Sequence, residues 1–205
     1  MSVRPLFITI EGIDGAGKST HLAAIQAQLT LAGARVRATR EPGGTPLAEA
    51  LREQVLRSAM DPLTEAMLVF AARRDHVLNV IRPALACGEV VLSDRFADAS
   101  FAYQGGGRGV AWRQLEVLED WACEGLRPGL TLWFDLDPAE AARRRARARA
   151  ADRFEAEDVA FFERVRDGYA RRQAADPGRF AVIDAGLSVD EVAAQVRQTL
   201  VDRGW

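Results

Sequence analysis

Gly12-Ile-Asp-Gly-Ala-Gly17-Lys18-Ser19 is the segment that decides the fold, because it is a complete G-x-x-x-x-G-K-[ST] phosphate-binding loop. Its glycines allow backbone angles at which successive N–H groups turn inward around an anion. Lys18 is the only lysine among 27 basic residues, and its ammonium is placed to reach the β- and γ-phosphates of a nucleotide. The Ser19 hydroxyl is placed to coordinate Mg²⁺. We therefore expect a nucleoside-triphosphate site made of consecutive residues: Gly12, Ile13, Asp14, Gly15, Ala16, Gly17, Lys18, Ser19 and Thr20.

Strand-like and helical patterns alternate along the rest of the chain. Short apolar runs at 6–10, 34–39, 90–93, 130–135 and 180–183 predict strands. Helical patterns cover 18–31, 45–57, 62–86, 112–124, 138–149, 158–174 and 189–203. This alternation predicts an α/β fold with a parallel five-stranded sheet and helices on both faces. No repeat or low-complexity linker divides the chain, so we expect one domain over residues 1–205.

Composition excludes some classes of function. The 205 residues are 48% hydrophobic and 27% charged, which suffices for one well-buried α/β domain. A net charge of −2 argues against a general nucleic-acid or membrane binder. No apolar run approaches the ~20 residues of a membrane span, and the N-terminus lacks a secretory apolar region. We therefore expect a cytoplasmic protein that acts on small molecules.

Three further elements fall where ligands bind in an open α/β sheet, beyond the carboxyl ends of the strands. They are Arg40-Glu-Pro-Gly-Gly-Thr45, Asp94-Arg95 and Tyr103-Gln-Gly-Gly-Gly-Arg-Gly109. The first and third are expected to be loops because they are rich in Gly and Pro. Alternatively, the glycines only turn the chain, and Asp94-Arg95 is a structural ion pair. Three such elements at equivalent places favour a binding site.

Together these segments resemble the thymidylate kinase family over nearly the whole chain. The most specific matches are Arg40-Glu-Pro-Gly-Gly-Thr45 and Ala102-Tyr-Gln-Gly-Gly-Gly-Arg-Gly109, with Ser93-Asp-Arg-Phe96 and Asp152-Arg-Phe-Glu155 also present. The resemblance implies ATP-dependent phosphorylation of dTMP to dTDP, a step in dTTP synthesis. It also implies Mg²⁺ as the cofactor and a homodimer formed through helices.

The resemblance assigns roles on the phosphate side. Asp94 resembles the carboxylate that holds Mg²⁺ through water. Arg95 resembles the guanidinium that grips the 5′-phosphate of the acceptor bidentately. Arg40 is similar to a second phosphate-side arginine, and Pro42 of the same segment belongs to the expected dTMP site. Asp14 resembles the carboxylate that accepts a hydrogen bond from the sugar 3′-hydroxyl; the alternative is an aspartate that only shapes the loop.

On the base side, Ser100 and Gln104 are similar to the polar groups that read the thymine edge. Tyr103 resembles the aromatic residue that packs where a ribose 2′-hydroxyl would lie, which favours deoxyribose. A half-buried core tyrosine is the alternative interpretation.

Phe70 and Arg73 are expected on one face of a helix, because they are three residues apart. In the family an aromatic residue stacks on thymine and an arginine reaches a base carbonyl. The family spaces the two by four, which would pair Phe70 with Arg74 or place Val69 at the aromatic position. We choose Arg73 because Arg73-x-x-His76 preserves another family spacing. A core phenylalanine beside a solvated arginine is the alternative.

An arginine-rich segment follows the fourth expected strand, and its arginines could be a solvated helix face. Residues 143–155 nevertheless resemble the mobile lid of this family. Arg143 or Arg144 is a candidate to pack on adenine. The cluster contains Arg143, Arg144, Arg145, Arg147, Arg149 and Arg153.

Some family members carry an arginine directly after the loop aspartate, where this chain has Gly15. If a guanidinium must neutralise the transferring phosphoryl group, the lid has to supply it. Arg147, Arg149 and Arg153 are therefore the candidates for transition-state contacts, with Lys18 and Arg95. No strong general base is expected, since the acceptor is already an anion.

Two other functions remain open from the sequence. One is a kinase of the same fold that acts on a different nucleotide or metabolite. The other is a nucleotide-dependent switch or nucleic-acid-associated ATPase, which would hydrolyse ATP at a rate unaffected by dTMP. The acidic balance and the short single domain weigh against the second.

Overall fold

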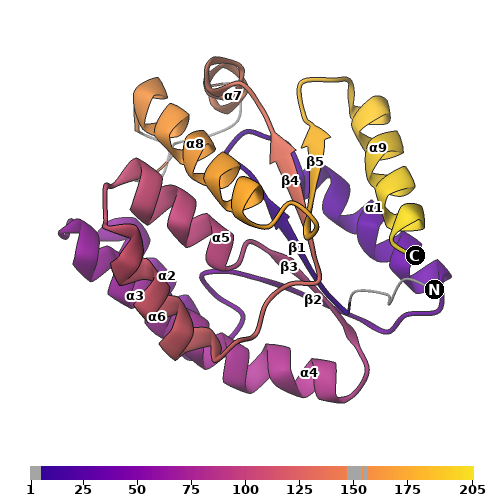
Figure 1. The fold of residues 1–205 in the computed structure, drawn as a ribbon, viewed down its shortest axis with the longest axis horizontal. Coiled ribbons are helices and arrows are strands. Elements are labelled where there is room, and N and C mark those ends of the chain that lie inside the picture. Colours follow the sequence, from indigo (N-terminus) through magenta and orange to yellow (C-terminus); the bar gives the residue numbers. More distant parts are fainter. Residues whose placement is uncertain (1–5, 147–153, 155–156) are drawn as a thin grey trace.

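A parallel five-stranded sheet forms the centre of the protein, as the sequence predicts. The computed structural model describes residues 6–146, 154 and 157–205. Its strands lie in the order β2-β3-β1-β4-β5, and every pairing is parallel (Figure 1). They are β1 (Phe7–Glu11), β2 (Val36–Arg40), β3 (Val90–Asp94), β4 (Leu130–Asp135) and β5 (Phe180–Asp184).

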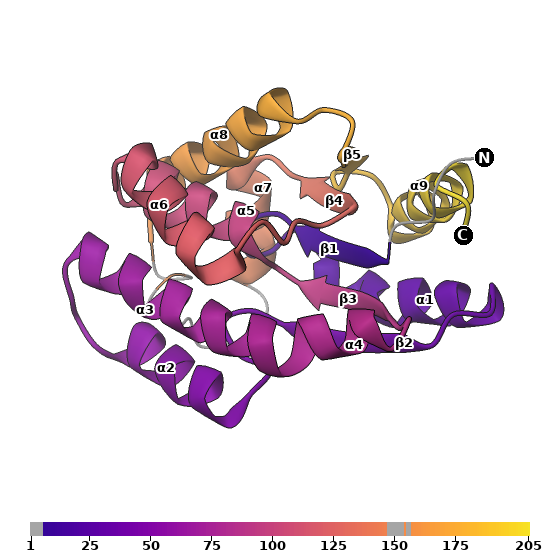
Figure 2. The same cartoon turned by 60° about the horizontal axis from the view of Figure 1, so that its bottom comes forward.

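Helices cover both faces of this sheet. Helices α1 and α9 lie on one side, and α4, α5 and α8 lie on the other (Figure 1). Helices α2 and α3 pack side by side farther from the sheet (Figure 2). The bounds are α1 (Lys18–Leu31), α2 (Pro46–Arg57), α3 (Pro62–His76), π-helix η1 (Val77–Ile81), α4 (Arg82–Ala86), α5 (Ala97–Ser100), π-helix η2 (Phe101–Gly107), α6 (Trp112–Cys123), α7 (Pro138–Arg145), α8 (Val159–Ala175) and α9 (Val189–Asp202).

Local sequence explains where several helices begin. A capping residue followed by proline starts three of them: Thr45 before α2, Asp61 before α3 and Asp137 before α7. In each case the side-chain oxygen accepts a hydrogen bond from a backbone N–H in the first turn, and proline there loses no helical hydrogen bond. Within the described residues, no helix has the length and apolarity needed to cross a membrane.

Both faces of the central strands are buried, which explains why their sequences are apolar without alternation. In β1, Ile8 and Ile10 belong to one hydrophobic cluster, whereas Phe7 belongs to the other. The strand register brings the carboxyl ends together, since Asp94 of β3 is opposite both Ile10 of β1 and Arg40 of β2. This edge of the sheet receives the phosphate-binding loop after β1 and the segment Arg40-Glu-Pro-Gly-Gly-Thr45 after β2.

The prediction of a loop at residues 103–109 is wrong, because α5 and η2 continue through Gly107 as helix. The glycines serve close packing there. A Cβ at Gly106 would collide with the backbone carbonyl of Arg164 in α8, and one at Gly168 would lie 2.7 Å from the Cα of Ala102. Helices η2 and α8 therefore approach each other at two glycines, one from each helix.

Candidate active site

The phosphate-binding loop joins β1 to α1. Gly12, Gly15 and Gly17 have φ values of 138°, 92° and 81°, and α1 begins at Lys18. The loop N–H groups and the N-terminus of α1 therefore meet at one place, which suits an anion. A side chain at position 15 would place its Cβ 2.7 Å from the carbonyl oxygen of Ala141, so glycine is also required by packing.

Lys18 lies folded against its own loop. Its ammonium donates hydrogen bonds to the carbonyls of Gly12 and Ile13, at 3.0 and 3.1 Å. Burial lowers the pKa of Lys18 to about 8, and Arg95 adds to the fall, while Asp14 opposes it. Phosphate oxygens would reverse part of this shift, because they stabilise the charged ammonium.

A polar cavity of about 710 Å³ opens above the loop. The residues that line this polar cavity come from the loop and the start of α1, from the carboxyl ends of β2 and β3, and from α2: Asp14, Gly15, Lys18, Ser19, Arg40, Glu41, Arg52, Asp94 and Arg95.

Asp94 makes the polar cavity suitable for a divalent cation. Its Oδ1 is buried and has no hydrogen-bond partner among the described residues. Ser19 lines the same cavity. The described part of the chain holds no cluster of three or more His, Cys, Asp or Glu side chains that could bind a metal. This donor set fits Mg²⁺, which uses one or two carboxylates and completes its shell with water and substrate phosphates.

A second cavity, of about 610 Å³, adjoins the first, and the two share Asp14, Glu41, Arg52 and Arg95. We call it the hydrophobic cavity, because apolar side chains form much of its wall. Its lining consists of Asp14, Glu41, Pro42, Arg52, Val55, Leu56, Val69, Arg73, Arg95, Phe96, Ala99, Ser100, Tyr103, Gln104 and Phe154.

Arg95 stands at the junction of the two cavities, and its backbone has a φ of 72°, which is rare for a non-glycine residue. Its Nη2 donates to Asp14 at 2.6 Å and to the Tyr103 hydroxyl at 3.0 Å. Its Nη1 donates to the Gly12 carbonyl and the Tyr169 hydroxyl, each at 3.0 Å. All four Nη hydrogens thus have protein acceptors, so a phosphate that binds at Nη1 or Nη2 must compete with one of them.

Asp14 is held as a carboxylate in this arrangement. Burial opposes ionisation, but Arg95 and Lys18 outweigh it and lower the pKa of Asp14 to about 2. The Tyr103 hydroxyl donates to its second oxygen at 2.8 Å. Asp14 and Tyr103, which the sequence predicts on the sugar side, therefore lie in contact.

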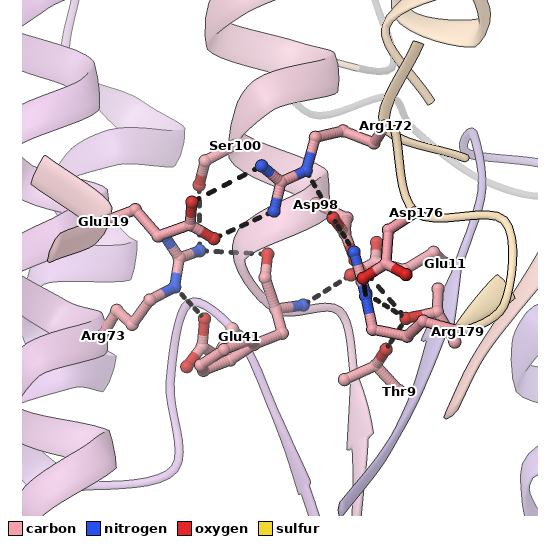
Figure 3. Close-up of polar contacts among 12 residues, drawn as sticks. Thr9, Glu11, Glu41, Arg73, Asp98, Ser100, Glu119, Arg172, Asp176 and Arg179 are labelled. Carbon is pink, nitrogen blue, oxygen red and sulfur yellow. Dashed lines mark hydrogen bonds and ion pairs between the residues drawn. The ribbon is translucent and has the colours of Figure 1, made fainter. Parts of the chain in front are cut away.

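Arg73 is fully buried and lines the hydrophobic cavity. Figure 3 shows it beside Glu41 and Ser100. Its Nε donates to Glu41 at 2.7 Å, and its Nη2 donates to the Phe96 carbonyl and to Ser100 Oγ. Its Nη1 is buried without a hydrogen-bond partner among the described residues. A buried cationic donor without an acceptor is costly, so this nitrogen suits a ligand carbonyl.

Gln104 is oriented by its surroundings. Its Nε2 donates to Glu65 Oε1 at 2.9 Å, and both residues are buried. An ionised carboxylate can accept hydrogen bonds but cannot donate them, so the amide nitrogen of Gln104 faces Glu65. The amide oxygen of Gln104 is then available as an acceptor at the hydrophobic cavity.

Helix α3 presents Arg73 to this cavity, as the sequence analysis selected, but it does not present Phe70. Phe70 does not line it: its ring is buried in the core, with the Arg73 guanidinium 4.5 Å from its centroid. Val69 and Arg73, four residues apart, both line the cavity. Arg74 instead pairs with Glu124 at 2.9 Å. The helix phase therefore places Val69 at the position that we assigned to Phe70.

Arg40 and Pro42, the remaining predicted residues on the phosphate side, each line one of the two cavities. Arg40 lines the polar cavity and pairs with Glu49 at 2.9 Å. Pro42 lines the hydrophobic cavity, and its carbonyl accepts a hydrogen bond from Arg52.

The arginine-rich segment is described only in part. Arg143 and Arg144 both pair with Glu140, and Arg144 also donates to the Ala185 carbonyl. Arg145, which we did not select, donates to the carbonyl of Asp14 at 2.7 Å. The candidates Arg147, Arg149 and Arg153 lie outside the described residues.

A buried ionic cluster lies beside the site (Figure 3). Asp98, 1% exposed, accepts hydrogen bonds from Arg172 at 2.7 Å and from Arg179 at 2.6 and 3.0 Å. Arg172 also pairs with Glu119 at 2.9 Å. These pairs join α5, α6, α8 and the approach to β5, so they hold the wall of the site rather than reach into it.

Sequence reasoning missed several residues that support the site: Glu11, Glu41, Glu65, Phe154 and Tyr169. Glu11 carried a usable signal, because a charged residue ends an apolar strand directly before the phosphate-binding loop. Tyr169 carried none, since its contact with Arg95 joins residues 74 positions apart.

The sheet order, the loop after β1 and the polar cavity define a P-loop nucleotide-binding domain, and a second cavity adjoins its loop. The family model described as Thymidylate kinase matches residues 10–196. The chain is 56% identical to the thymidylate kinase of Ralstonia nicotianae over 198 residues, covering 95% of this chain and 97% of that protein. It is 56% identical to the thymidylate kinase of Paracidovorax citrulli over 212 residues, covering 100% and 96%. The chain belongs to the thymidylate kinase family.

Proposed function

We propose that the protein transfers the γ-phosphoryl group of ATP to the 5′-phosphate of dTMP, which yields ADP and dTDP. The observation that supports this proposal most directly is that the polar cavity at the phosphate-binding loop adjoins the hydrophobic cavity. Arg95 and Asp14 lie in the wall of both cavities. Two substrates placed in these cavities would meet phosphate to phosphate.

Alignment and charge neutralisation account for the chemistry. Lys18 and the loop N–H groups would hold the β- and γ-phosphates of ATP. Arg95 would bind the acceptor phosphate, which displaces one of its present acceptors. The acceptor oxygen is already anionic, so no general base is required.

Mg²⁺ is part of the proposal, with Asp94 holding it through water and the Ser19 hydroxyl as a direct ligand. The unpartnered Oδ1 of Asp94 supports this assignment. The ion would neutralise charge on the phosphates of ATP.

The hydrophobic cavity would read the base and the sugar. Arg73 Nη1 offers a donor for a carbonyl oxygen, and the Gln104 amide oxygen offers an acceptor for a ring N–H. Thymine carries both groups on one edge, whereas cytosine has an amino group and an unprotonated ring nitrogen there. Ser100 supports Arg73 through a 2.9 Å hydrogen bond. Tyr103 and Asp14 would face the deoxyribose.

The catalytic guanidinium would come from Arg147, Arg149 or Arg153. Gly15 supports this, because packing against Ala141 excludes a side chain at that loop position. Arg143 or Arg144 would contact adenine.

The proposal extends to a single domain that works as a homodimer in the cytoplasm, where ATP and deoxynucleotides are available. Helices α3 and α6 pack together and carry exposed apolar side chains that a second copy could cover. Examples are Met67, 48% exposed, and Trp121, 71% exposed.

Comparing acceptors tests the function against a kinase of the same fold with another substrate. Phosphorylation of dTMP, dUMP, dCMP and dGMP would be measured by ADP release at equal ATP. We expect dTMP to have the highest kcat/KM, with dCMP and dGMP at least about 100-fold lower because their edges mismatch the buried polar groups. A preference for dCMP or dGMP would overturn the assignment.

A further inference from the structure

The two nitrogens at the end of the Arg95 side chain face different surroundings. Nη2 contacts Asp14 and Tyr103, which both line the hydrophobic cavity. Nη1 contacts Gly12 and Tyr169, and neither of these lines either cavity in the described structure. A substrate phosphate would therefore compete at Nη2, while Nη1 stays attached to the protein interior.

Tyr169 connects Nη1 to a buried carboxylate. Its hydroxyl accepts the Arg95 hydrogen bond at 3.0 Å and donates to Glu11 Oε2 at 2.9 Å. Tyr169 and Glu11 are both fully buried, on α8 and β1. The other oxygen, Glu11 Oε1, accepts the backbone N–H of Phe96 at 2.7 Å. One carboxylate thus fixes the backbone next to Arg95 and, through Tyr169, its side chain.

The donors and acceptors along the hydrogen bonds from Arg95 through Tyr169 to Glu11 favour an ionised Glu11. A tyrosine hydroxyl has one hydrogen, and because it accepts from Arg95, that hydrogen is free to go to Glu11. The Phe96 N–H is a second donor to the same carboxylate. Burial raises the pKa of Glu11 to about 8, with Asp98 adding to the rise and Arg95 opposing it. Ionised Glu11 is therefore costly to desolvate at this place. Its hydrogen-bond donors are the Tyr169 hydroxyl, which contacts Arg95, and the backbone N–H of Phe96.

We infer that Tyr169 and Glu11 are positioning residues that hold the Arg95 guanidinium in place for the acceptor phosphate. The inference rests on the proposed function. The chain Glu11–Tyr169–Arg95 fixes one nitrogen and leaves the opposite one to exchange Asp14 or Tyr103 for phosphate. The backbone strain at Arg95, with its φ of 72°, fits a residue that its neighbours hold in one orientation.

Tyr169→Phe tests this inference, because it removes one oxygen and keeps the ring. Binding of dTMP and of ATP would be measured separately by calorimetry. We expect the Kd of dTMP to rise roughly tenfold, as for loss of one hydrogen bond to a charged group, and the Kd of ATP to change less than about twofold. Thr9→Val is the matched control: its buried hydroxyl also lies on β1 but contacts Thr131 at 3.0 Å, so dTMP affinity should not change.

A double-mutant cycle separates positioning from general support of the fold. If Tyr169 acts through Arg95, adding Tyr169→Phe to Arg95→Ala should change the Kd of dTMP less than about twofold. Thermal melts would check folding, and Glu11→Gln would replace Tyr169→Phe in the cycle if that variant did not fold, with an expected change in the same direction.

The positioning role would be overturned if Tyr169→Phe lowered dTMP affinity equally with arginine or alanine at position 95. It would also be overturned if Tyr169→Phe alone left the dTMP affinity of the parent unchanged, or lowered ATP affinity as much as dTMP affinity. A parent enzyme that binds ATP but no dTMP would instead overturn the proposed function itself, and the role of Tyr169 toward dTMP with it.

Discussion

The polar and hydrophobic cavities are built in different ways. The polar cavity takes Asp14, Gly15, Lys18 and Ser19 from one stretch of chain, which folds by local rules into a loop and the start of α1. The hydrophobic cavity takes its lining from α2, α3, α5, η2 and the segments around them, which meet only in the folded protein. The loop side of the first therefore depends on a few consecutive residues, although Asp94 and Arg95 reach it from β3 and the residue after it. The second depends throughout on contacts such as Arg73–Glu41 and Gln104–Glu65.

This difference predicts how substitutions will act. Removing one group from the polar cavity should stop turnover with little effect on the fold. Removing one group from the hydrophobic cavity should divide its effect among affinity, selectivity and stability, because each polar residue there also supports a neighbour.

Lys18→Met should have the largest effect. It removes the only lysine of the chain. Because the proposed function has this ammonium hold the β- and γ-phosphates, kcat should fall by about 10³-fold or more. The melting temperature should stay near that of the parent. Turnover within a few-fold of the parent would contradict the assignment, and Lys18→Arg should not restore the rate, because a planar guanidinium does not replace a compact ammonium.

Arg95→Ala tests the junction of the cavities. We expect phosphoryl transfer to fall by about 10²- to 10³-fold and the Kd of dTMP to rise, while the Kd of ATP changes little. The comparison of the two Kd values decides the outcome. Equal losses for ATP and dTMP would identify Arg95 as a structural partner of Asp14, with which it pairs at 2.6 Å.

The arginines of the segment 143–155 should act mainly on the rate. Alanine at Arg147 or Arg149 should lower kcat by about 10²-fold and dTMP affinity much less, because the contact forms chiefly in the transition state. Single-turnover transfer would measure this. Arg143→Ala is the control for kcat, since Arg143 pairs with Glu140 on the surface. If Arg143 contacts adenine, this variant should raise the KM of ATP with little loss of kcat. If a double variant of Arg147 and Arg149 transfers phosphate at the parental rate, these arginines have no catalytic role and belong to a solvated helix face.

A smaller effect should appear with pH. The pKa of Lys18 is about 8 in the free protein, below its usual 10.5, so the ammonium is lost as pH rises through 8. ATP phosphates bind the charged form, and ATP affinity should therefore fall by up to about tenfold per pH unit above 8. Titrations between pH 7.5 and 9.5 would measure it. Lys18→Met separates this from Glu11, whose pKa is also about 8: a slope that persists in that variant belongs to another group.

Much of the polar cavity was predictable from sequence, because the G-x-x-x-x-G-K-[ST] spacing determines its backbone locally. The five strands and the position of Asp94 at the end of β3 followed from apolar runs. The hydrophobic cavity was less predictable. The phase of α3 decides that Val69 rather than Phe70 faces it. The glycines at 105–107 suggested a turn, although Gly106 and Gly107 allow η2 to approach α8. The link from Tyr169 to Arg95 depends on tertiary packing alone.

The most direct test of the account is ADP release from ATP measured with and without dTMP. The two adjoining cavities predict that release is slow without dTMP and rises by orders of magnitude with it, with one dTDP formed for each ADP. The same ADP release with and without dTMP would contradict the account, because the protein would then be a nucleotide hydrolase or switch without a small acceptor.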